Sequence, residues 1–142
     1  HFISRVTGLS PTFTSNPTQI GPNVAQYVDT VHTNTAMHGN FNSRGMASFL
    51  VNSGERQPWC GSDNACSHDA AMILWAESVL TNQPSFPSLN CDAWENFCNR
   101  NCDNNHVSNM GQFSHSGARG LYFLQTNNLR PFSRNEATPL GC

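Results

Sequence analysis

Hydrophobic and polar residues alternate over several short segments of this chain, in the pattern that is typical of β-strands. The first such segment, Phe2-Ile-Ser-Arg-Val6, leads into the turn Gly8-Leu-Ser-Pro11, so we expect a strand that stops at Gly8. On the same grounds, strands are expected over residues 25–33, 47–51 and 120–126. The loop expected over residues 12–23 is rich in Thr, Ser, Asn, Pro and Gly.

One segment has helical spacing instead. Apolar residues recur at positions 71, 74, 75 and 79, and Ser67 is a suitable N-cap, so we expect a helix from Ser67 to Leu80. Residues 81–118 are rich in Asn and are expected to be irregular. Strands that are separated by loops and a helix, without hairpin turns, favour the α/β class of fold.

The composition of the 142 residues narrows the possible partners. A chain of this length fits one domain. Charged residues make up only 11% of it, lysine is absent and the net charge is −2, which disfavours binding to nucleic acid. No apolar run approaches the roughly 20 residues that a membrane span needs. The first residue, His1, is expected to be a processed or cloned terminus.

The six cysteines point to disulfides in a secreted protein, because no C-x-x-C or H-x₃-H pair suggests zinc. Cys60 and Cys66 would close a small loop, and Cys91 and Cys102 would staple a short helix or turn that carries Trp94 and Phe97. The remaining two, Cys98 and Cys142, would either join each other or reach another chain. The sequence alone does not choose among these pairings.

Several segments, in chain order, resemble the C-terminal half of the catalytic domain of pancreatic-type lipases. Residues 6–12 (V-T-G-L-S-P-T) resemble I/V-T-G-L-D-P-A, and residues 27–34 (Y-V-D-T-V-H-T-N) resemble F-V-D-V-I-H-T-N/D. Residues 45–60 are similar to G-H-x-D-F-Y-x-N-G-G followed by Q-P-G-C, and residues 66–78 to C-S/N-H-x-R-A-x-x-Y-F-A-E-S. Met110-Gly111, residues 120–126 and Pro131-Phe132 match the closing strand. The resemblance implies an α/β-hydrolase fold, with residues 1–142 as the C-terminal portion of one such domain, and it supports the Cys60–Cys66 and Cys91–Cys102 pairs.

The resemblance also implies a partner. The family's catalytic triad runs Ser, Asp, His along the chain, with the serine in G-x-S-x-G. That motif is absent here, so the nucleophile is expected in a missing N-terminal half. Because a half-sheet with open edges is prone to associate, we expect a second chain, cleaved from the same precursor, to complete the sheet, and we expect an oligomer.

Two triad positions fall within this chain. His68 matches the family's general base, although it could instead be a histidine at a helix start with no catalytic duty. The acid position is occupied by Ser10, which cannot supply the negative charge that stabilises an imidazolium. The other usual acid position holds the neutral Asn34, and Asp29 lies within a strand where it is expected to be structural.

We expect no metal or cofactor, because the chain departs from the family at its acid-rich calcium loop. The segment that corresponds to the family's calcium loop, residues 16–24, contains no carboxylate. The histidines outside the triad position show no convergent metal-binding pattern, and the three tryptophans are expected to pack in the core or in loops: His32, His38, His106, His115, Trp59, Trp75 and Trp94.

Three functions remain open. The first is a secreted, catalytically impaired lipase-like protein with a storage role, as in the yolk proteins of insects, or a lipid-binding role. The second is an active triacylglycerol lipase or phospholipase A1 with a degenerate triad, and the third is a carrier that uses the acyl pocket. An intact G-x-S-x-G in the missing half would favour the enzyme.

Overall fold

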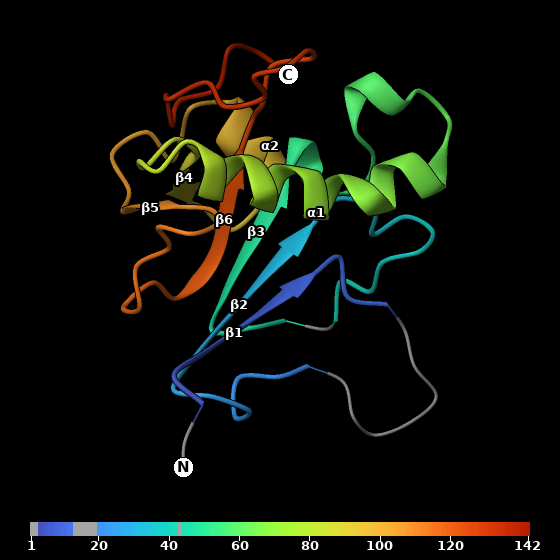
Figure 1. Ribbon diagram of the computed structural model, residues 1–142. Coiled ribbons are helices and arrows are strands. Elements are labelled where there is room, and N and C mark those ends of the chain that lie inside the picture. Colours follow the sequence, from blue (N-terminus) through green and yellow to red (C-terminus); the bar gives the residue numbers. More distant parts are fainter. Residues whose placement is uncertain (1–2, 13–19, 43) are drawn as a thin grey trace.

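The computed structural model describes residues 3–12, 20–42 and 44–142 (Figure 1). Its six strands form one sheet, in the order β1 (Arg5–Leu9), β2 (Tyr27–His32), β3 (Ala47–Val51), β6 (Gly120–Leu124), β4 (Pro87–Asn90) and β5 (Val107–Asn109). The first four of these strands are parallel, whereas β4 runs antiparallel to both β6 and β5. Short 3-10 turns, η1 (Asn52–Gly54) and η2 (Pro58–Cys60), follow β3.

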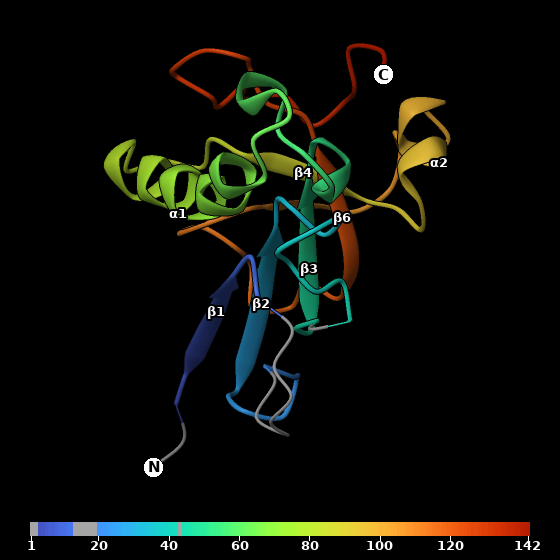
Figure 2. The ribbon, with the colours of Figure 1, turned by 90° about the vertical axis from the view of Figure 1, so that its right-hand side faces the viewer.

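Helices lie on both faces of this sheet, as Figure 2 shows. The long helix α1 (Asn64–Leu80) covers one face, where Phe49, Leu74 and Tyr122 are part of the larger core. The short helix α2 (Trp94–Cys98) covers the other face, with a core that includes Phe97 and Phe123. The strands β2 and β3 are buried along their whole length, as expected of parallel strands that are covered on both faces.

Several boundaries differ from the sequence expectation. The helix α1 begins at Asn64 instead of Ser67, because Asp63 is the N-cap and its carboxylate accepts a hydrogen bond from the Cys66 amide at 3.0 Å. The hydroxyl of Ser67 is buried and accepts from the Gln57 amide instead. Strand β1 extends through Gly8 to Leu9, because Gly8 and Leu9 pair with β2.

The segment expected to be irregular, residues 81–118, contains β4, α2 and β5. Helix α2 carries Trp94 and Phe97. It is the short helix or turn that was expected between Cys91 and Cys102. The strand pairing of β4 depends on β6, more than 25 residues further along the chain, where Leu89 is paired with Phe123.

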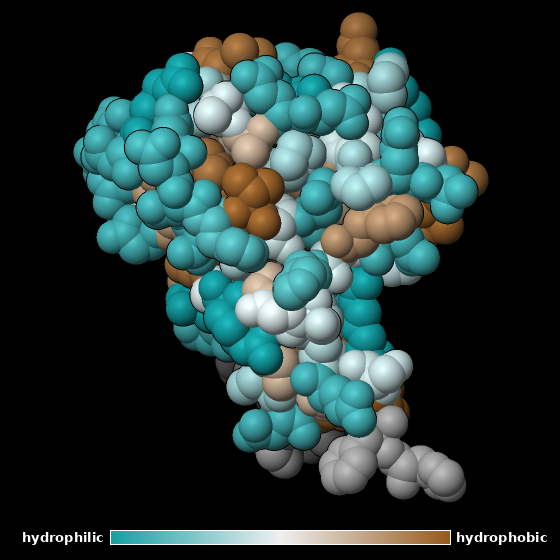
Figure 3. All heavy atoms as spheres, turned by 90° about the vertical axis from the view of Figure 1, so that its left-hand side faces the viewer, coloured by the Kyte–Doolittle hydropathy of each residue, from teal (hydrophilic) through white to brown (hydrophobic). Residues whose placement is uncertain are grey.

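Three disulfides fix the loops and the chain end: Cys60–Cys66, Cys91–Cys102 and Cys98–Cys142. These pairs confirm the two short-range bridges, and they join the two remaining cysteines to each other. The described helices include none that is both long and apolar enough to cross a bilayer. On the face shown in Figure 3, hydrophobic side chains gather in small separate patches among hydrophilic ones.

Candidate functional site

The structure brings Ser10 and His68 together at the carboxyl end of the parallel strands. Ser10 directly follows β1, and its backbone amide donates to the carbonyl oxygen of Val31 at 2.7 Å. Its side chain is buried, and its Oγ lies 3.0 Å from Nδ1 of His68, 58 residues further along the chain. The two residues that match the acid and base positions of the family therefore form a hydrogen-bonded pair.

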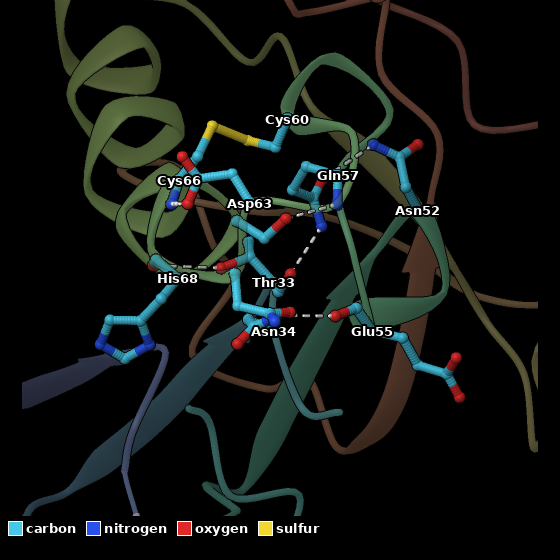
Figure 4. The surroundings of a disulfide bond; sticks show 11 residues. Thr33, Asn34, Asn52, Glu55, Gln57, Cys60, Asp63, Cys66 and His68 are labelled. Atoms are coloured by element: carbon cyan, nitrogen blue, oxygen red, sulfur yellow. Dashed lines mark hydrogen bonds between the residues drawn. A yellow bond between two sulfur atoms is a disulfide. The ribbon is translucent and has the colours of Figure 1, made fainter. Parts of the chain in front are cut away.

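The ring of His68 is positioned by the start of α1. The Cys60–Cys66 disulfide closes the loop before the helix, and the Thr33 hydroxyl donates to the backbone carbonyl of His68 at 3.3 Å (Figure 4). Because Thr33 follows β2 directly, this hydrogen bond joins the first turns of the helix to the edge of the sheet that carries Ser10.

Gln57 connects the same helix start to two strands. Its buried side-chain amide donates to the carbonyl oxygens of Thr33 and Val51, each at 3.0 Å, and its backbone amide donates to Ser67 Oγ at 3.0 Å. Its Oε1 accepts a hydrogen bond from Asn52 at 2.9 Å. The Gln57-Pro58-Trp59-Cys60 motif therefore fixes the start of α1, the helix that carries His68, against the ends of β2 and β3.

The chemistry of the pair depends on which atom carries the proton between Ser10 and His68. A carboxylate can only accept, so it would hold the proton on Nδ1 and leave Nε2 free to act as a base. A hydroxyl can accept from Nδ1 or donate to it, and in the second case the proton of a neutral His68 is on Nε2. Ser10 thus orients the ring without fixing its base-competent tautomer.

Asn34, at the alternative acid position that the resemblance implies, is engaged in hydrogen bonds on all sides of its amide. Its Nδ2 donates to the carbonyl oxygen of Glu55 at 3.1 Å and to Asn64 Oδ1 at 3.2 Å, and its Oδ1 accepts from the His38 amide at 2.8 Å. The side chain is fully buried and holds the following loop together. The amide at this alternative acid position is therefore structural.

His38 is the site residue that the sequence pattern missed. Its ring lies against that of His68, with the centroids 5.8 Å apart in a T-shaped arrangement. The loop that presents it is tight, because the Gly39 amide donates to the Asn34 carbonyl at 2.8 Å. Only this loop conformation brings His38 to the site, and no sequence motif signals it.

Two other polar side chains of β2 are structural. Asp29 is buried and forms an ion pair with Arg5 at 2.7 Å, and it accepts a hydrogen bond from the Thr7 hydroxyl at 2.7 Å. His32 Nε2 lies 2.9 Å from Thr30 Oγ1, and burial, with a smaller contribution from the Arg44 charge, lowers the pKa of His32 to about 4. Asp29 and His32 therefore have structural roles in the sheet, as the sequence predicts.

The segment that corresponds to the family's calcium loop is described only in part. Of the residues compared with the calcium loop, 16–19 lie outside the described part of the chain, and the remaining residues 20–24 contain no carboxylate. Cys91, Asp92 and Cys102 lie close together, but the two sulfurs share a disulfide, so neither is available as a thiolate ligand.

Comparison with known proteins decides the family. The lipase family profile matches residues 1–132. This chain belongs to the pancreatic-type lipase family. It is 27% identical to pancreatic lipase-related protein 3 of Homo sapiens, over 93% of the chain and 37% of the relative.

Two further relatives bear on the function of this lipase-family chain. It is 28% identical to inactive pancreatic lipase-related protein 1 of Homo sapiens, over 70% of the chain and 27% of the relative. It is 34% identical to phospholipase A1 of Vespula vulgaris, over 54% of the chain and 24% of the relative. The chain thus spans about a quarter to somewhat over a third of the length of these relatives. The fold is that of an α/β-hydrolase, and its six-stranded mixed sheet is consistent with part of such a domain.

Proposed function

We propose that this chain supplies the histidine-bearing half of a lipase-like catalytic domain whose catalysis is impaired. The observation that carries the proposal is the 3.0 Å contact between Ser10 Oγ and His68 Nδ1. In the proposed mechanism His68 is the general base that takes the proton of a serine nucleophile. Ser10 takes the position of the triad acid, and its hydroxyl is a neutral dipole where the mechanism needs a negatively charged carboxylate.

The cost of the substitution follows from the charge that develops during the reaction. When His68 takes the proton it becomes an imidazolium, and a carboxylate beside Nδ1 stabilises that cation. Neutralising the acid in a Ser-His-Asp triad lowers turnover by about 10⁴-fold, which corresponds to ~5.5 kcal/mol in the barrier. The similarity to a relative named as inactive supports the proposal.

We propose further that the nucleophile is carried by a second chain, which pairs with the free edge of β1. Within the described residues, β1 pairs with β2 alone, and its residues are only half-buried. A cavity of about 410 Å³ beside this strand is lined by Arg5, Thr7, Leu9, Trp75 and Gln112. The indole nitrogen of Trp75 is buried and has no hydrogen-bond acceptor among the described residues, which supports a partner at this edge.

The proposed setting is extracellular. Three disulfides in 142 residues are typical of secreted proteins and rare in reducing compartments. Within that setting we propose a storage role of the yolk-protein type or a lipid-binding role, because either role can persist without turnover.

The second candidate is an active triacylglycerol lipase or phospholipase A1 with a degenerate triad. Its support is the similarity to phospholipase A1 of Vespula vulgaris, together with the capacity of a serine hydroxyl to accept a hydrogen bond from Nδ1. In this case Ser10 keeps the ring oriented, and the reaction proceeds without charge stabilisation from an acid.

Ester hydrolysis by the natural assembly separates the two candidates. A short-chain ester and a phospholipid are the substrates, and His68→Ala is the control. Little or no turnover in the wild type supports impairment, and a rise of orders of magnitude in Ser10→Asp would show that the nucleophile is intact. Robust wild-type turnover that disappears in His68→Ala would overturn the impairment and establish the enzyme.

A further inference from the structure

A groove of about 370 Å³ opens on the face of the sheet that α2 covers. Three aromatic side chains from separate parts of the chain line it, namely Phe41, Trp94 and Phe123. Leu50 and Leu121 contribute aliphatic surface between them. Phe41, Trp94 and Leu121 are partly accessible at the groove, whereas Leu50 and Phe123 are buried.

Two carboxylates stand at the same groove. Glu55 and Asp92 both line it and both are exposed. Neither forms an ion pair within the part of the chain that the structure describes. Figure 4 shows the Glu55 carboxylate extending away from its loop, whereas its backbone carbonyl accepts the Asn34 hydrogen bond. Asp92 Oδ1 accepts a hydrogen bond from Asn96 Nδ2 at 2.8 Å, but among the described residues its charge has no cationic partner. Aromatic rings and two carboxylates outside any described ion pair thus meet in one concave surface.

One cation already uses an aromatic ring at the border of this groove. The guanidinium of Arg44 lies 3.8 Å from the centroid of Phe41, close enough for a cation–π contact. Arg44 is not among the residues that line the groove. Its Nε also donates to the Phe41 carbonyl oxygen at 3.0 Å, so the cation is held at that ring.

We propose that this groove binds a quaternary ammonium group, such as that of choline. Such a group has no N–H to satisfy, and its methyl groups pack well on aromatic faces that attract the positive charge. The carboxylates of Glu55 and Asp92 supply charge complementarity at the rim. A neutral apolar ligand would use the rings but would gain nothing from the acids.

The groove and the Ser10–His68 pair flank the same short segment. Thr33 donates to the carbonyl of His68, whereas Thr35, two residues later, lines the groove. In Figure 4, His68 and Glu55 lie on opposite sides of Thr33 and Asn34. A phospholipid with a choline headgroup carries an ester and a quaternary ammonium in one molecule, so it has the chemistry that suits both sites. This link to a lipid rests on the proposed function, whereas ammonium binding itself does not.

Calorimetric titration of the natural assembly with tetramethylammonium and with choline tests the site. The neutral carbon isostere of choline, dimethylbutanol, is the matched ligand control. We expect saturable binding of both cations and at least several-fold weaker binding of the isostere. Glu55→Gln and Asp92→Asn should each weaken cation binding roughly two- to five-fold, the scale of single exposed charge and cation–π contacts.

Two further variants separate the site from a general charge effect. Glu95→Gln removes an exposed carboxylate of α2 that does not line the groove, and it should leave the affinity unchanged. Arg44→Gln removes the competing cation and should tighten binding by a similar two- to five-fold factor. Equal binding of the isostere and the cations, equal effects of Glu55→Gln and Glu95→Gln, or no saturable binding would each overturn the proposal.

Vesicles identify the source of the ammonium group. Co-sedimentation with phosphatidylcholine vesicles, displaced by tetramethylammonium and absent for phosphatidylglycerol vesicles, would assign the site to a lipid headgroup. Binding of the free cations without binding of the vesicles would assign it to a soluble ligand. Because these measurements do not require turnover, they stand even if the proposed triad roles fail.

Discussion

Asn34 Oδ1 accepts a 2.8 Å hydrogen bond from the backbone amide of His38, so the residue at the alternative acid position builds the loop beside His68. The His38 ring reaches His68 because this loop turns back tightly on Asn34. The neutral side-chain amide of Asn34 thereby holds the loop that places His38 beside His68.

The tightness of that loop can be tested at Gly39. A Cβ at this position would lie 2.9 Å from the Asn34 carbonyl oxygen, which is backbone and cannot easily move away. We expect Gly39→Ala to lower the free energy of unfolding by about 1–3 kcal/mol in denaturant titrations. Gly21→Ala is the control, because a Cβ there meets nothing within 4 Å. Equal stability of the two variants would contradict the packing described.

Acid should destabilise the fold through His32. Its pKa is about 4 in the folded protein and about 6.5 in the unfolded chain, so the unfolded state binds the proton first as the pH falls. Stability is therefore lost between about pH 6.5 and pH 4, by about 3 kcal/mol for this residue. Unfolding measured across this range should show a shallower loss in His32→Gln.

The exposed Asn128, which does not titrate, provides the control for that series. Asn128→Gln should keep the wild-type dependence on pH. An identical loss in wild type and His32→Gln would show that His32 does not carry the effect.

The Cys91–Cys102 disulfide should contribute substantially to stability. It holds the segment that bears α2 and the second core, and replacing both cysteines by serine should cost about 2–5 kcal/mol. Thermal unfolding under non-reducing conditions measures the loss. Peptide mapping without reduction provides the independent check, and a fragment in which Cys60 is linked to Cys91 would be incompatible with the pairing.

If the second chain pairs with the free edge of β1, the backbone amides of β1 should become protected from exchange. Adding the half that carries the nucleophile should slow hydrogen exchange of the β1 amides, because they gain a strand partner. The amides of β5, at the other end of the sheet, are the internal control. We expect this chain alone to self-associate in size-exclusion chromatography. A stable monomer whose β1 amides exchange equally with and without the second half would refute the pairing.

The sequence predicted the strands whose own residues are strand formers. Val28 and Val31 in β2, and Tyr122 in β6, are β-branched or aromatic and are buried in the sheet. The pattern did not reveal β4, which has no β-branched or aromatic residue, because pairing with β6 stabilises that strand. Distant pairing of this kind leaves little trace in a local pattern.

Some residues of the candidate site could likewise be predicted from the sequence, and one could not. Ser10 and His68 could be placed from their motifs, because each motif fixes a residue relative to its own strand or helix. His38 could not, because its approach to His68 depends on the buried hydrogen bonds of Asn34 and on the narrow space at Gly39. Loop geometry of this kind arises from packing in three dimensions.

The Cys98–Cys142 bridge has a consequence for how the protein survives proteases. It closes a covalent ring that contains β5, β6 and the loops around them. A single cut anywhere between residues 103 and 141 leaves two fragments that remain attached through this bond. A nicked molecule would therefore migrate as one species until a reductant is added, and it could keep its fold while its backbone is broken.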